Sequence, residues 1–354
     1  MDETAYRIMD TLARNLGRPL SINALRARID DAFSSGYYKN IYDKVGVLAK
    51  EGILKTETIG KSKIVSIDLS NPGTIDKLTE MEMERKRCVA MGNNELGMLF
   101  LEIETYFSQD FRLISSISAI DSKKNIRFRR AEFLVLLKEP RNAEELRIET
   151  VNIGRLMKQF QSGHNLRMDF IAMAQKEFFG LLASSEYNPI KPMVSGQISI
   201  LYPQNYWISI REFFRKGMAV KPADESSPAN ISETEMEYNL ARFGYKELGG
   251  KLKKGRDICI ESIISSVLIS GDARRKEAIP ILLVKNNVNY GILVFMARKY
   301  NVDAMLLGFL KALNRIKHVD GVEDAIAVLE SLGAKELKAD DKSIKGKMRL
   351  YNAD

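Results

Sequence analysis

Cysteine and histidine are scarce in this 354-residue chain, which contains Cys88, Cys259, His164 and His318 and no others of either type. A structural zinc site needs about four cysteine, histidine or carboxylate ligands at close spacing, so we expect no bound metal. Neither cysteine has a histidine nearby in the sequence, which argues against a thiol nucleophile. Both cysteines are expected to be buried, small apolar residues.

Long apolar runs are also missing, since no stretch approaches the roughly 20 residues that cross a bilayer. The first ten residues, MDETAYRIMD, are acidic and amphipathic rather than basic and apolar. That pattern is wrong for a secretory signal, so we expect a cytoplasmic protein without a membrane partner. The length allows two or three domains, each able to bury its own core.

Positive charge is in excess, with a formal net charge of +8. Net charge alone says little about fold, but it favours an anionic partner. The distribution of the charge is more informative, and it leads to the N-terminal segment.

The first 70 residues predict three helices followed by a hairpin. Apolar residues recur at helical spacing over residues 3–15, Ser21 can cap a second helix, and a third runs from about Tyr37 to Glu51. Gly52 can end that helix in the left-handed conformation. ILKTET and KIVSIDL then alternate apolar and polar residues, as strands do.

This order of elements resembles the winged helices of archaeal and bacterial transcription regulators. The resemblance implies that the third helix enters the major groove and that the turn between the strands grips the backbone. The expected DNA-binding residues are Tyr37, Tyr38, Lys39, Asn40 and Lys44 on the helix, with Lys61, Ser62 and Lys63 at the turn. Some winged helices bind protein instead, and that alternative stays open.

A polar stretch follows the module. TIDKLTEMEMERKR is rich in Glu-to-Lys/Arg pairs at i,i+4 spacing, such as Glu82 with Lys86. It predicts a solvated spacer helix, and a dimer seam is the alternative.

Residues 95–210 alternate helical and strand-like segments, which predicts a small mixed α/β sheet. The order of elements and the closing phrase ISILYPQNYW resemble nucleotidyltransferases of the DNA polymerase beta type. The resemblance implies a Gly-Ser after the first strand, an Asp-x-Asp pair on the second and a further carboxylate on a later strand. Such carboxylates would hold two metal ions.

The chain departs from this pattern at each metal-binding position. Asp121-Ser122 replaces Gly-Ser, and the Asp-x-Asp positions fall at Ala131 and Phe133, with Glu132 as the nearby acid. Asp169 alone fits the third carboxylate. One carboxylate cannot hold two divalent ions, so we expect an inactive remnant with no catalytic residue and no cofactor.

A basic run stands where the acids should be. KKNIRFRR offers Lys123, Lys124, Arg127, Arg129 and Arg130 to phosphates. An edge strand guarded by positive charge explains the same run equally well.

The remaining chain predicts a linker and a helical domain. Pro280 should kink a helix or start one, and the charged stretch from Lys335 to Asp354 is expected to be loosely ordered or strand-like. The predicted divisions are 1–73 (winged helix), 74–94 (linker helix), 95–210 (nucleotidyltransferase-like), 211–240 (linker) and 241–354 (helical).

The sequence therefore predicts a multidomain α+β protein that binds double-stranded DNA as a transcriptional regulator. An active nucleotidyltransferase acting on protein or RNA, as in toxin-antitoxin pairs, is the alternative, using Glu132 and Asp169 with Asp121. A protein-protein scaffold is a third. The sequence leaves a homodimer open, in which two recognition helices would lie about 34 Å apart.

Overall fold

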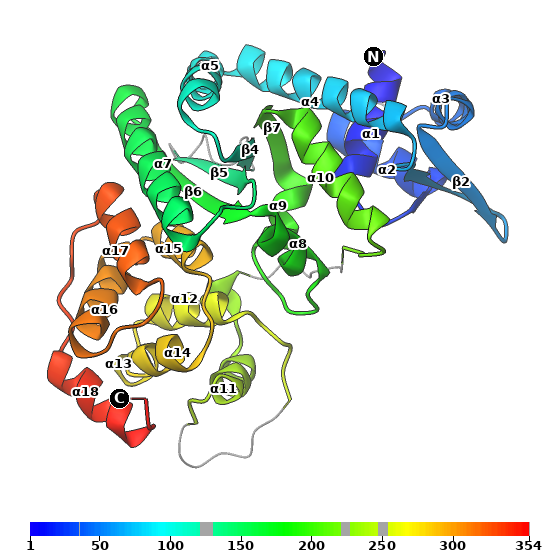
Figure 1. The fold of residues 1–354 in the computed structure, drawn as a ribbon. Coiled ribbons are helices and arrows are strands. Elements are labelled where there is room, and N and C mark those ends of the chain that lie inside the picture. Colours follow the sequence, from blue (N-terminus) through cyan, green and yellow to red (C-terminus); the bar gives the residue numbers. More distant parts are fainter. Residues whose placement is uncertain (35, 121–129, 221–226, 247–253, 354) are drawn as a thin grey trace.

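A computed structural model describes residues 1–34, 36–120, 130–220, 227–246 and 254–353 (Figure 1). This part of the chain is a mixed α+β protein, as the sequence predicts. Every helix in these ranges is too short or too polar to span a bilayer.

The N-terminal module, residues 3–67, begins with a helical segment and ends in a hairpin. Its elements are α1 (Glu3–Arg14), β1 (Leu20–Ser21), α2 (Ile22–Phe33), α3 (Tyr38–Lys50), β2 (Leu54–Ile59) and β3 (Ser62–Ile67). The strands form an antiparallel sheet in the order β1-β3-β2. Ser21 caps α2 by accepting a hydrogen bond from the Ala24 amide at 3.1 Å, as predicted. Gly52 follows α3 with φ of +73°, where glycine is strained least.

The central segment holds a second sheet and the helices around it. Its elements are α4 (Pro72–Gly92), α5 (Asn94–Asp110), β4 (Ile114–Ile120), β5 (Arg130–Leu137), α7 (Ala143–His164), β6 (Arg167–Ala174), α8 (Gln175–Ala183), α9 (Ile190–Gly196), β7 (Gln197–Leu201) and α10 (Pro203–Arg215). The strand order is β6-β5-β4-β7. The crossover helix α7 lets β5 and β6 run parallel, whereas β4 pairs antiparallel with β5 and β7.

The C-terminal segment is helical. Its elements are η1 (Pro228–Asn230), α11 (Glu233–Arg242), α12 (Ile260–Ser270), α13 (Ala273–Lys276), α14 (Ile279–Lys285), α15 (Tyr290–Lys299), α16 (Asp303–Ile316), α17 (Val322–Ser331) and α18 (Asp341–Leu350). Pro280 lies in the first turn of α14, so the predicted helix start is confirmed. The expectation of a loose or strand-like ending is wrong, because Ile344 and Met348, one turn apart, bury against neighbouring helices.

Hydrophobic side chains of the described residues gather in two cores on opposite faces of the central sheet. Strand β5 shows the division, since its side chains alternate between the faces. Phe133, Val135 and Leu137 join the core shared with α5, α7 and the C-terminal helices. Leu134 and Leu136 join the core shared with the N-terminal module and α8–α10. Each core therefore crosses at least one of the divisions that we predicted from the sequence.

Helix α4 differs from the exposed spacer that we expected. It packs against α5, α10 and β7, and it runs along the top of the molecule in Figure 1. Its polar residues Glu82 and Arg85 are nevertheless buried. Each of them has a polar partner on another element, which offsets the cost of burying it. Cys88, near the end of α4, is exposed, so its predicted burial is wrong.

The buried charges form what we call the α1–α4 clamp: Asp10 on α1, with Arg85 and Glu82 on α4. The Arg85 guanidinium donates to the Asp10 carboxylate, and it donates to Glu82 at 2.7 Å. Glu82 in turn accepts from the amide of Ser199 on β7 at 3.0 Å. The clamp thus joins the N-terminal module to the central sheet.

The pKa values of the two carboxylates of the clamp are shifted in opposite directions. Burial raises the pKa of Glu82 above its ordinary value, although Arg85 and the Ser199 amide oppose the rise. Burial alone would also raise the pKa of Asp10, but the guanidinium groups of Arg85 and Arg14 hold it below the usual 3.8. Ionised Asp10 therefore stabilises the fold above that pH, and the contribution is lost as the pH falls through the folded pKa.

Asp10→Asn should lower the free energy of unfolding at neutral pH by about 3–5 kcal/mol, because it leaves Arg85 buried with one charged partner fewer. Urea unfolding measures the loss. The variant should also lose less stability than the parent chain on acidification. Asp31→Asn, a change at an exposed carboxylate on α2, is the control. Equal stability of the two variants would contradict the clamp.

Candidate functional site

Helix α3 shows one face to its own module and the other to solvent. Ile41, Val45 and Leu48 recur at helical spacing and are buried, as the sequence predicts. They pack α3 against α1 and α2, while the start of the hairpin covers its C-terminal end. The opposite face therefore points outward.

The predicted residues at the N-terminal end of α3 are at the surface. Tyr37 and Tyr38 are 75% and 46% exposed. Lys39 and Asn40 are exposed as well. These side chains carry hydroxyl, ammonium and amide groups, which hydrogen-bond to phosphates and base edges.

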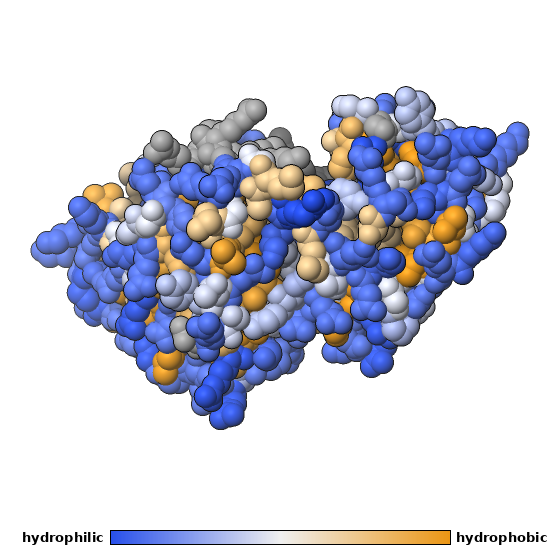
Figure 2. All heavy atoms as spheres, turned by 90° about the horizontal axis from the view of Figure 1, so that it is seen from above, coloured by the Kyte–Doolittle hydropathy of each residue, from blue (hydrophilic) through white to orange (hydrophobic). Residues whose placement is uncertain are grey.

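The hairpin β2–β3 projects beside α3 and forms the outermost part of the right-hand end of the molecule in Figure 1. Ile59 pairs with Ser62, so Gly60 and Lys61 make a two-residue turn. Gly60 has φ of +61°, as a tight hairpin turn requires at this position. Lys61 and Ser62 are exposed at the tip. Figure 2, which keeps the left-right direction of Figure 1, shows a mainly hydrophilic surface at this end.

One tyrosine that we did not single out joins helix and hairpin. Tyr42 lies one turn after Tyr38, and their rings stack with centroids 6.0 Å apart and 25° between the planes. The Lys63 ammonium lies over the Tyr42 ring, 5.0 Å from its centroid. The i,i+4 spacing of the two tyrosines was the signal that could have found this contact.

Lys44 is placed differently from the other predicted lysines. Its ammonium binds Asp2, just before α1, at 2.7 Å. The hydrogen bond from Lys44 is the main reason why the pKa of Asp2 is lowered. Lys39 and Lys61 are therefore the better candidates for free phosphate ligands.

The predicted phosphate-binding run 123–130 lies outside the described residues except for Arg130. Arg130 begins β5 and turns inward, donating to the carbonyl of Lys299 and, at 3.3 Å, to the side chain of Asn301. Its guanidinium also lies 3.5 Å from Asp169. Arg130 is thus engaged within the protein, and its phosphate role stays a prediction.

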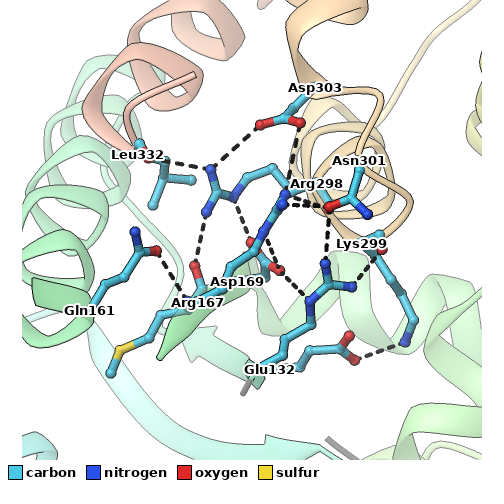
Figure 3. Close-up of polar contacts among 11 residues, drawn as sticks. Glu132, Gln161, Arg167, Asp169, Arg298, Lys299, Asn301, Asp303 and Leu332 are labelled. Atoms are coloured by element: carbon cyan, nitrogen blue, oxygen red, sulfur yellow. Dashed lines mark hydrogen bonds and ion pairs between the residues drawn. The ribbon is translucent and has the colours of Figure 1, made fainter. Parts of the chain in front are cut away.

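A second cluster surrounds the two carboxylates of the predicted remnant site (Figure 3). Glu132 and Asp169 are paired across the parallel strands β5 and β6, and both are buried. Glu132 binds the Lys299 ammonium at 2.8 Å. Asp169 accepts from Arg298 at 2.6 Å and lies 3.4 Å from the guanidinium of Arg167.

Cationic side chains surround these acids, with Arg167 and Arg298 at Asp169 and Lys299 at Glu132. Within the described ranges, no three side chains of histidine, cysteine, aspartate or glutamate are grouped as a metal ion requires. Asp121, the third acid of the alternative enzyme hypothesis, lies outside those ranges, so that hypothesis stays a prediction. What the cluster does is join β5 and β6 to the end of α15. We call it the β6–α15 cluster.

Sequence reasoning found half of this cluster. It named Glu132 and Asp169 but missed Arg298 and Lys299, which lie well over a hundred residues further along the chain. Both cations follow the apolar stripe of α15 and carry no local motif.

The chain matches no known family model, no curated protein and no solved structure. Its function is therefore inferred from geometry and chemistry.

Asp169→Asn should lower the free energy of unfolding by about 3–5 kcal/mol, because the amide leaves buried guanidinium groups without their counter-charge. Urea unfolding is the measurement, and Asp320→Asn, at a fully solvated carboxylate, is the control. A variant as stable as this control would show that the cluster does not join the sheet to α15.

Proposed function

We propose that the protein binds double-stranded DNA through the N-terminal module and acts as a transcriptional regulator. The module is then a winged helix, in which α3 enters the major groove and the β2–β3 hairpin follows the adjacent backbone. The order α1-β1-α2-α3-β2-β3 and the strand order β1-β3-β2 support this assignment.

One observation supports the proposal most strongly. Helix α3 and the β2–β3 hairpin both lie at one end of the molecule, away from the central sheet and the C-terminal helices (Figure 1). Helix α3 is 13 residues long. An α-helix with its side chains is about 10–12 Å across, so α3 fits the major groove of B-form DNA, which is about 12 Å wide.

Charges of both signs lie on this surface, so it does not form one continuous basic patch. Lys39 and Lys61 are exposed at the start of α3 and at the hairpin tip. Asp43 on α3 and Glu57 on β2 are exposed as well. Phosphate oxygens would meet the two lysines at the edges of the contact. The acids would disfavour loose binding over the whole surface, which favours a defined orientation on the duplex.

The rest of the chain then serves to position the module. The α1–α4 clamp fixes α1 to α4, and the β6–α15 cluster fixes the sheet to the C-terminal helices. In this proposal Glu132 and Asp169 are partners of buried cations rather than ligands of a metal.

The double variant Lys39→Glu/Lys61→Glu should weaken binding to duplex DNA and flatten its salt dependence. Loss of two phosphate contacts lowers the slope of log affinity against log salt by about 2. Fluorescence anisotropy with a labelled duplex of mixed sequence, titrated over a range of salt concentrations, measures both effects.

Lys335→Glu/Lys338→Glu is the matched control, because both lysines are exposed and lie far along the chain. Each double variant changes the net charge of +8 by the same amount. An equal loss of affinity in both variants would mean that only overall charge matters, and the proposed interface would be wrong. A parent chain that binds no duplex would also show that the proposed interface is wrong.

A further inference from the structure

Gly46 is a glycine whose presence the fold does not explain. It lies in the interior of α3, where glycine makes a helix less stable than alanine would. A Cβ added at this position would meet no atom within 4 Å, and Gly46 is not among the glycines with positive φ. Neither crowding nor backbone conformation requires glycine here. The missing side chain leaves the backbone of α3 bare on its outward side.

Apolar and aromatic groups flank this bare backbone. Tyr42 lies one turn before Gly46 and Val47 directly after it, and they are 43% and 44% exposed. The Tyr42 ring contacts the Tyr38 ring and the Lys63 ammonium of the hairpin. A surface of this kind can contact a methyl group on a closely approaching partner.

Two hydrogen-bonding groups elsewhere on the exposed surface of α3 point to particular bases. Asn40 is exposed, and an asparagine amide pairs with the N6 and N7 atoms of adenine. Asp43 is exposed too, and it can accept from the amino group of adenine or of cytosine, so it does not discriminate between them. Arginine and lysine are the usual readers of guanine; α3, YKNIYDKVGVLAK, contains no arginine, and its exposed Lys39 is a phosphate ligand in the proposed function.

These groups are complementary to the two bases of one type of base pair. In the major groove an A·T pair presents the adenine N6/N7 edge and the thymine C5-methyl group. On the proposed DNA-binding function, on which this step rests, we infer that α3 reads A·T pairs. Thymine methyl groups pack against Tyr42 and Val47, Asn40 reads adenine, and the helix backbone comes closest to the bases at Gly46.

Selection of duplexes from a random pool by the full-length chain tests the base preference. We expect an A·T-rich core in the selected site. Deoxyuridine in place of each thymine of that site removes the C5-methyl group alone. Binding should weaken about four-fold for each methyl group that α3 buries. A G·C-rich site, or full affinity for the uracil-containing duplex, would overturn the inference.

Gly46→Ala tests the point of closest approach, with Gly346→Ala as its control. Gly346 also lies inside a helix, α18, and a Cβ there would likewise meet no atom within 4 Å. Both variants should unfold at a higher temperature than the parent chain. Gly46→Ala alone should bind the selected duplex about ten-fold more weakly.

The possible results distinguish the inferred close approach of α3 to the bases from the proposed DNA binding on which it rests. Gly46→Ala binding as tightly as the control would overturn the close approach of α3 and leave DNA binding intact. Recovery of no duplex at all from the pool would overturn both.

Discussion

The arrangement of this protein depends on one interaction, the buried pairing of the Arg85 guanidinium with the carboxylates of Asp10 and Glu82. An ion taken out of water must keep its partners, because a single unpaired buried charge costs several kcal/mol. The partners here belong to α1, α4 and, through Ser199, to the central sheet. The N-terminal module is therefore fixed in one orientation, with α3 and the hairpin tip turned away from the rest of the molecule.

The central sheet then distributes the apolar side chains. Alternate residues of β5 serve the core of the N-terminal module and the core of the C-terminal helices, so a single strand contributes to both. The β6–α15 cluster closes the second junction as the α1–α4 clamp closes the first. In both junctions a buried aspartate is held by arginine, whose rigid fork of donors suits buried pairs better than lysine does.

Much of the local structure could be predicted from the sequence, because it follows from local patterns. The spacing of Ile41, Val45 and Leu48 predicted the inward face of α3, and Pro280 predicted the start of a helix. The junctions could not be predicted in this way. Glu82 and Arg85 look like members of a solvated helix face, and only Asp10 and Ser199, which lie far away in the sequence, show that they are buried. Arg298 is hidden from sequence reasoning for the same reason. The candidate site was half predictable: residues 37–40 and the hairpin tip were found, whereas Tyr42 and Gly46 became meaningful once the hairpin was placed beside α3.

In the proposed function, α3 and the hairpin are the surface that meets DNA. Hydrogen exchange of the full-length chain, with and without duplex DNA, tests this most directly because it reports on every segment at once. Exchange should slow in residues 37–47 and 58–64 when DNA is added, while the amides around Asp10 and Arg85 should be equally protected in both states. Slower exchange confined to the C-terminal helices, with α3 and the hairpin unchanged, would contradict the account.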